Sequence, residues 1–137
     1  MKTYEVINHT ADTGIKAYGD TLPELFENAA RGMRDIMVDP GTVRPVRQLN
    51  VEVEGEDVEE LLVEWLNDLI YLFDTQHLVP SSFKVLELDK QHLLAEVHGE
   101  HYDEQVHEMR HEIKAVTYHM LSVKKDDGWS ATVVFDV

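Results

Sequence analysis

Residues 58–73 have the sequence VEELLVEWLNDLIYLF, and this stretch decides the fold class. Its apolar side chains recur every three or four residues, which is typical of one face of an α-helix. Asp57 precedes it with Glu60 three residues later, a spacing that favours a capped helix start. We therefore expect a helix over 58–74, roughly 25 Å long. Its expected apolar stripe is Val58, Leu61, Leu62, Trp65, Leu66, Leu69, Leu72 and Phe73.

A second helix is expected upstream of this one. Thr21 and Glu24 have the capping spacing again, and Pro23 is compatible with a first helical turn. Apolar residues then recur at helical spacing from Leu22 to Met37. The sequence Asp-Pro-Gly at 39–41 ends the helix, because proline disfavours helix in the residue before it and glycine permits a turn.

The remaining segments favour β-strands. Leu86 and Leu88 fall out of phase with the residues before them, which predicts either a bulge or cover on both faces of that strand. Residues 106–114 fit both periods, and we favour a strand there slightly over a helix. Strands are expected at 2–7, 15–19, 49–54, 83–88, 93–97, 115–124 and 129–137.

The order of these elements predicts an α+β protein. Two strands, a helix, a strand and a helix are followed by several more strands. This order favours two helices packed on one face of a largely antiparallel or mixed β-sheet. A length of 137 residues suits a single domain that spans 1–137.

The composition is strongly acidic. Twelve Lys and Arg residues against 27 Asp and Glu residues give a formal net charge of −15. Such a surface repels nucleic acid and anionic membranes and favours basic partners and cations, although it also serves solubility alone. The absence of cysteine excludes disulfides, thiolate zinc sites and cysteine nucleophiles. No apolar run suits a membrane span and the start MKTYE is no signal peptide, so we expect a cytoplasmic protein.

Few motifs point to catalysis. The glycines lack the spacing of a phosphate-binding loop, and no serine lies in a nucleophile elbow. His107 and His111 are four residues apart, a spacing that on a helix presents two imidazoles to zinc. On a strand they would lie roughly 13 Å apart, which is too far for one ion. A surface or structural role is therefore favoured for both histidines.

Two aspartates form a candidate metal site. Asp12 lies in the polar loop between the first two expected strands, where an Asp usually bonds nearby backbone amides. Asp136 lies in the apolar run 133–137, and the chain end adds a carboxylate at Val137. If Asp12 met Asp136, three hard oxygen groups would converge on Ca²⁺ or Mg²⁺. Without a cation the charges would repel one another.

Several motifs, taken in order, resemble the archease family. Together they cover nearly the whole chain and are far more specific than the first motif alone, and residues 101–111 are the least similar. The motifs are HTAD at 9–12, GIKAYG at 14–19, LFENAA at 25–30, LVEWLNDL at 62–69, KAVTYHML at 114–121, GW at 128–129 and VVFDV at 133–137.

The resemblance implies a non-catalytic cofactor of an RtcB-type tRNA-splicing RNA ligase. Such a protein promotes guanylylation and multiple turnover of the ligase, and broadens its nucleotide use. The resemblance also implies a divalent cation, calcium or possibly magnesium, bound by Asp12, Asp136 and Val137. His9, Lys114 and His119 lie in the family-like motifs and are secondary candidates near this site. For His119 a structural role is favoured.

Two alternatives stay open at this point. The first is a magnesium-dependent hydrolase that uses Asp12 and Asp136 with His9 as base, and the second is a chaperone-like binding module. Against the hydrolase, no basic group that could hold phosphate lies nearby in the sequence, and the negative charge opposes RNA substrates. We expect a non-enzymatic protein that binds the ligase, with no stable direct nucleic-acid binding and no membrane association.

Overall fold

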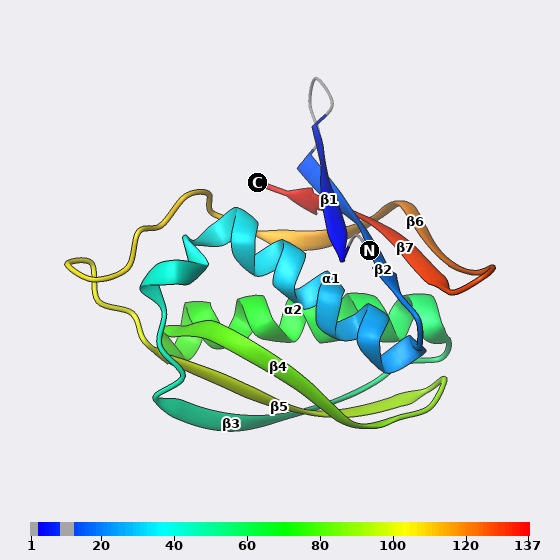
Figure 1. Ribbon diagram of the computed structural model, residues 1–137, viewed down its shortest axis with the longest axis horizontal. Helices are drawn as coiled ribbons and strands as arrows, with labels where there is room; N and C mark the ends of the chain where they lie inside the picture. Colours follow the sequence, from blue (N-terminus) through cyan, green and yellow to red (C-terminus); the bar gives the residue numbers. More distant parts are fainter. Residues whose placement is uncertain (1–2, 9–12) are drawn as a thin grey trace.

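The computed structural model describes residues 3–8 and 13–137 (Figure 1). Its elements follow the expected order closely, with the strands longer than expected at several ends. They are β1 (Tyr4–Asn8), β2 (Thr13–Gly19), α1 (Leu22–Met37), the 3-10 turn η1 (Pro40–Thr42), β3 (Arg47–Glu54), α2 (Val58–Gln76), β4 (Leu78–Leu88), β5 (His92–His101), β6 (Ala115–Lys125) and β7 (Trp129–Asp136).

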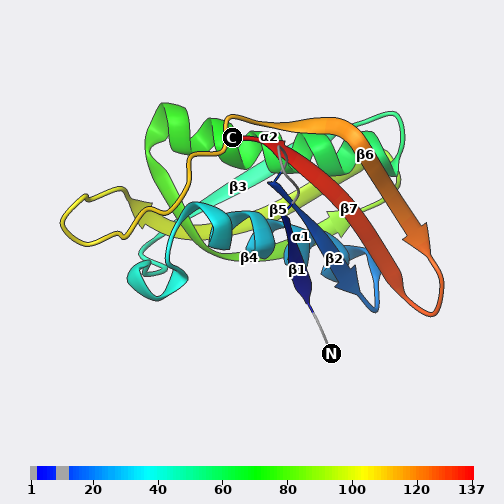
Figure 2. The ribbon, with the colours of Figure 1, turned by 90° about the horizontal axis from the view of Figure 1, so that it is seen from above.

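The two helices lie between two antiparallel sheets (Figures 1 and 2). One sheet has the strand order β1-β2-β7-β6 and the other β3-β5-β4. Helix α1 contacts β2 and β4, and α2 contacts β6 and β3, so each helix touches both sheets. The α+β class and the two helices are confirmed, but the strands form two sheets where one was expected.

The reason for two sheets lies in the helix α2 itself. Val63 and Ile70 lie outside the expected apolar stripe, and both are buried. A helix that is apolar on more than one side needs cover on more than one side. The second sheet supplies that cover.

Side-chain caps begin both helices as the sequence predicts. The hydroxyl of Thr21 accepts a hydrogen bond from the backbone N–H of Glu24 at 3.3 Å. The carboxylate of Asp57 accepts one from the N–H of Glu60 at 2.8 Å. These bonds satisfy amides that have no partner inside the first helical turn.

Trp65 joins the helices and one sheet in the core. Its side chain is fully buried, and its indole N–H donates to the carbonyl of Phe26 in α1 at 3.0 Å. The indole also packs edge-on against Phe83 of β4, with ring centroids 6.1 Å apart. One residue therefore links α2 to α1 and to the β3-β5-β4 sheet.

The bulge expected near Leu86 is present in β4. Val85 pairs with Ala95 and Glu87 with Leu94, so Leu86 has no partner in β5. Leu86 is 43% exposed. The backbone N–H of Val85 donates to Glu27 of α1 at 2.9 Å, which fixes the bulged edge against the helix.

The preference for a strand at 106–114 is wrong. This segment is irregular apart from one bridge between Met109 and Val38. Its backbone bonds the end of α1 instead, because the N–H of Arg110 donates to the carbonyl of Met37 at 2.8 Å. Ile113 separately enters the main core. The apolar residues serve different contacts, so neither helical nor strand periodicity applies.

None of the helices in the described part of the chain is long and apolar enough to span a membrane.

Gly99 of β5 provides a test of the packing between β4 and β5. A Cβ at this position would lie 2.1 Å from the carbonyl oxygen of Val79. We expect Gly99→Ala to lower the free energy of unfolding by about 1–3 kcal/mol, measured by urea denaturation. In Gly41→Ala the nearest atom would be a carboxylate oxygen of Asp39 at 3.3 Å, so the change should stay within about 0.5 kcal/mol. Equal losses in both variants would contradict this packing.

Candidate functional site

The end of β7 lies beside the end of the β1–β2 hairpin at which β1 ends and β2 begins. Strand β7 is central in its sheet, and its Phe135 pairs with Thr13 of β2. Thr13 in turn pairs with Asn8 of β1. Asp12 and His9 lie outside the described residues, so the meeting of Asp12 with Asp136 stays a prediction. The described strands place Asp136 one residue beyond the partner of Thr13.

Strand β6 borders the same chain end from the other side. Ala115 pairs with Asp136, and the backbone N–H of Lys114 donates to the carbonyl of Asp136 at 2.7 Å. Asp136 and Lys114 are both exposed. The side chain of Asp136 makes no hydrogen bond or ion pair with the described residues.

A cleft of about 340 Å³ opens next to Val137, which is itself 48% exposed. Arg110 in this cleft donates from Nη1 to the backbone carbonyl of Asp35 at 3.1 Å. Its Nη2 lies 3.9 Å from a carboxylate oxygen of Asp39. The cleft is lined by Val6, Thr13, Asp35, Ile36, Arg110, His111 and Val137.

Two basic residues, Arg110 and Lys114, bear on the argument that no basic group lies near the candidate metal site. The sequence placed no phosphate-binding basic group near the two aspartates, but the fold brings Lys114 beside Asp136 and Arg110 into the cleft at Val137. Sequence reasoning missed Arg110 because residues 101–111 are the least family-like stretch. No spacing rule links that segment to the chain end.

Asp35 lines the cleft, but its carboxylate contacts other residues of the fold. The hydroxyl of Tyr4 donates to its Oδ2, and Nε of Arg34 lies 2.5 Å from its Oδ1. Burial, and then the hydrogen bond to Asp35, raise the pKa of Tyr4 to about 12. The phenol thus remains a donor at neutral pH. Both carboxylate oxygens of Asp35 thus already have partners within the fold.

His107 is a structural histidine, as the sequence favoured. It is buried, and its Nδ1 accepts the backbone N–H of Asp103 at 2.9 Å. Its Nε2 therefore carries the proton and donates to Glu100 at 2.7 Å. His111 lies apart from it in the cleft. Within residues 3–8 and 13–137, no three metal-ligating side chains of the His, Asp or Glu type form a cluster.

His119 is not brought to the chain end. Thr117 pairs with Val134, already two residues back from Asp136, and His119 lies two residues beyond Thr117. It is exposed, and its backbone N–H donates to the hydroxyl of Thr117 at 3.3 Å. Of the secondary candidates, Lys114 lies beside Asp136, His119 lies away from it, and His9 is outside the described residues.

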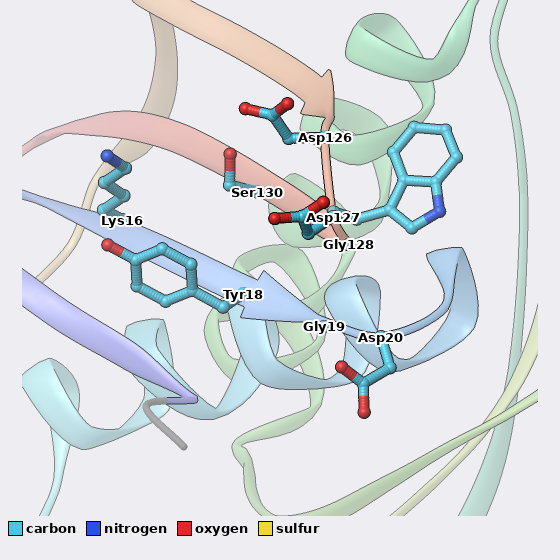
Figure 3. Close-up of a pocket in the computed structure, with 9 residues that line it drawn as sticks. Lys16, Tyr18, Gly19, Asp20, Asp126, Asp127, Gly128 and Ser130 are labelled. Carbon is cyan, nitrogen blue, oxygen red and sulfur yellow. The ribbon is translucent and has the colours of Figure 1, made fainter.

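A larger hollow of about 650 Å³ lies at the opposite ends of β2 and β7 (Figure 3). Gly19 pairs with Trp129 there, whereas Thr13 pairs with Phe135 near the candidate metal site. Asp20 and Asp127 are exposed side chains of this hollow. They belong to no metal-binding cluster of the described residues. We assign the hollow no role.

The family model that matches the chain is described as the Archease protein family (MTH1598/TM1083), and it covers residues 4–137. A protein archease of Pyrococcus furiosus is 39% identical over the full length of both chains. One of Methanosarcina acetivorans is 42% identical over 99% of this chain and 97% of its own.

Two solved structures share the fold. The solution structure of protein 1598 of Methanobacterium thermoautotrophicum has a TM-score of 0.86, with 40% identity and full coverage of both chains. The crystal structure of an archease, possible chaperone, of Thermotoga maritima has a TM-score of 0.66. It is 23% identical and covers 96% of this chain and 94% of its own.

The bond between His107 and Glu100 predicts how stability depends on pH. This bond, with contacts from Arg44, lowers the pKa of Glu100 from its usual 4.5. A lowered folded-state pKa adds stability above the usual value, and this stability is lost as the pH falls through the folded value. We expect Glu100→Gln to lower the urea midpoint at pH 7 and to reduce its decline between pH 5 and 3. If the urea midpoint of this variant fell between pH 5 and 3 as steeply as that of the wild type, the stabilising role of the bond between His107 and Glu100 would be contradicted.

Proposed function

Because the chain belongs to the archease family, we propose that it is a non-catalytic cofactor that activates an RtcB-type tRNA-splicing RNA ligase. It would promote guanylylation and multiple turnover of the ligase and broaden its use of nucleoside triphosphates. The observation that carries this proposal is the match to the family over residues 4–137. The acidic surface supports it, because a net charge of −15 suits a partner that holds RNA on a basic surface.

The proposed cofactor is a divalent cation, calcium or magnesium, held by Asp12, Asp136 and oxygens of Val137. The donor set supports this choice, since hard cations prefer carboxylate and carbonyl oxygens. The exposed Asp136 side chain has no partner among the described residues. The pairing of Thr13 with Phe135 brings the residues next to Asp12 and Asp136 in sequence together. A bound cation would offset the repulsion between the carboxylates.

A second candidate function is a magnesium-dependent hydrolase at the same site. The observation that favours it is the placement of Lys114 beside Asp136 and of Arg110 in the cleft at Val137. These cations would suit a phosphate group. The purified protein alone, incubated with RNA and phosphoester substrates, separates the two candidates. Turnover without ligase would favour the hydrolase.

We expect Asp12→Ala and Asp136→Ala each to abolish stimulation of the ligase. The measurement is ligation of a 2′,3′-cyclic-phosphate RNA by substoichiometric ligase, with and without this protein. Both variants should keep the fold, because an ion at the surface stabilises by mass action and not through the core. Calorimetric titration with Ca²⁺ should show binding to the wild type and none to either variant.

Asp126→Ala is the matched control. Asp126 is an exposed aspartate at the other end of β7, in the turn between β6 and β7. This variant should stimulate the ligase and bind Ca²⁺ like the wild type. Full stimulation by Asp136→Ala would show that the proposed ion has no part in the function.

The charge of the protein predicts how binding depends on salt. We expect no measurable affinity for RNA alone, because a net charge of −15 opposes the phosphate backbone. Affinity for the ligase should fall as salt rises, since screening at physiological ionic strength acts over about 8 Å. Titrations with ligase and with tRNA half-molecules at several salt concentrations measure both. Tight, salt-sensitive RNA binding without ligase would contradict the proposal.

A further inference from the structure

Strand β6 contains a wide bulge that the proposed cation site does not use. Thr117 pairs with Val134 and Ser122 with Thr132, so four residues of β6 lie opposite the single residue Val133. Within the bulge Met120 has a φ of 56°, in the left-handed region that residues other than glycine rarely occupy. His77 has the same φ as the C-cap of α2, but no helix ends at Met120.

The bulge places two large apolar side chains in solvent. Tyr118 is 61% exposed and Met120 is 58% exposed. The next residue, Leu121, packs against the main core and anchors the bulge. A side chain in a strained, exposed position adds little to the stability of the fold. Such outliers concentrate at functional sites.

Three carboxylates at the start of α2 and at its N-cap lie on the side of Tyr118. Asp57, Glu60 and Glu64 follow one another at spacings of three and four, so they lie on the same side of the helix. Burial and then the charges of Glu60, Glu64 and Asp57 raise the pKa of Tyr118, which is consistent with their closeness. The three carboxylates and the two apolar residues together are called the β6–α2 surface below.

The two elements of this surface are held together. The side chain of Asn67 in α2 accepts the backbone N–H of Val116 in β6 at 2.9 Å. The hydroxyl of Thr117 donates to the carbonyl of Val134 at 2.9 Å, which secures the start of the bulge. These two bonds fix β6 to α2 up to the start of the bulge, which lowers the cost of ordering this part of the backbone on docking.

We propose that the β6–α2 surface docks a basic protein, with Tyr118 and Met120 inserted into an apolar pocket flanked by Lys and Arg. Aromatic and methionine side chains are enriched in interface cores, and opposite charges at the rim select the partner. This inference rests on the proposed function, in which the partner is the RNA ligase.

Two other occupants fit the surface poorly. A nucleic acid would bring phosphates against Glu60 and Glu64. A second copy of this chain, related by a two-fold axis, would bring the same carboxylates face to face. A basic protein satisfies both the charges and the apolar pair. Docking here would also bring the chain end near the docked protein. Strand β6 connects the bulge to Ala115, which pairs with Asp136.

Met120→Gly separates docking from folding. Glycine adopts the left-handed backbone without strain, so the melting temperature should be kept or raised. Loss of the side chain should weaken binding to the ligase by about tenfold or more, as for a central interface residue. Tyr118→Ser should have a similar effect. Glu64→Gln should weaken binding less and reduce its dependence on salt.

Leu86→Ser and Asp74→Asn are the matched controls. Leu86 is an exposed apolar residue in the bulge of the other sheet, and Asp74 is an exposed acid in the last turns of α2. Both variants should bind the ligase like the wild type, as measured by biolayer interferometry at constant salt. An equal loss of affinity in these controls would overturn the assignment to the β6–α2 surface.

The outcomes keep the two proposals distinct. A wild-type protein that neither binds nor activates the ligase would overturn the proposed function, and with it the assignment of the partner. A wild-type protein that activates the ligase, together with unchanged binding of Met120→Gly and Tyr118→Ser, would overturn the docking surface alone. Selective loss of binding in these two variants, with melting temperatures preserved, would support it.

Discussion

The enclosure of α2 on two sides is the constraint on which the rest of the structure depends. Trp65 shows this best, because its indole lies in the main core and hydrogen-bonds α1 while its ring contacts Phe83 of β4. On another side of the helix, Asn67 holds β6. A helix fixed in this way positions both sheets, and each sheet then has one face for the core and one face for solvent.

The local parts of the fold were predictable from the sequence and the distant pairings were not. Caps at Thr21 and Asp57 depend on residues three positions away, and both were predicted correctly. The bulge at Leu86 followed from a break in alternation. Periodicity does not say which sheet a strand joins, so the division into two sheets was missed. The prediction of a strand at 106–114 was wrong because this segment pairs with the end of α1, about 70 residues away in sequence.

Some residues of the candidate site were likewise predictable from the sequence and others were not. The family-like motifs identified Asp136 and Lys114, which the fold brings together through the bond from Lys114 to Asp136. The same motifs suggested His119, but this residue lies within the bulge in β6, beyond the pair of Thr117 with Val134 and away from the chain end. Arg110 was missed because its place in the cleft depends on a backbone bond to Met37. Spacing along the chain contains no information about such a contact.

The pairing of β2 with β7 has a consequence for the order of assembly. The sheet β3-β5-β4 uses residues 47–101, whereas the other sheet joins the residues before 20 to those after 114. Contacts between remote segments require closure of a long loop and form slowly. Asp136 lies where this closure occurs, between Phe135 and the chain end. We therefore expect the candidate site to be completed late in folding, after the local contacts within residues 47–101 have formed.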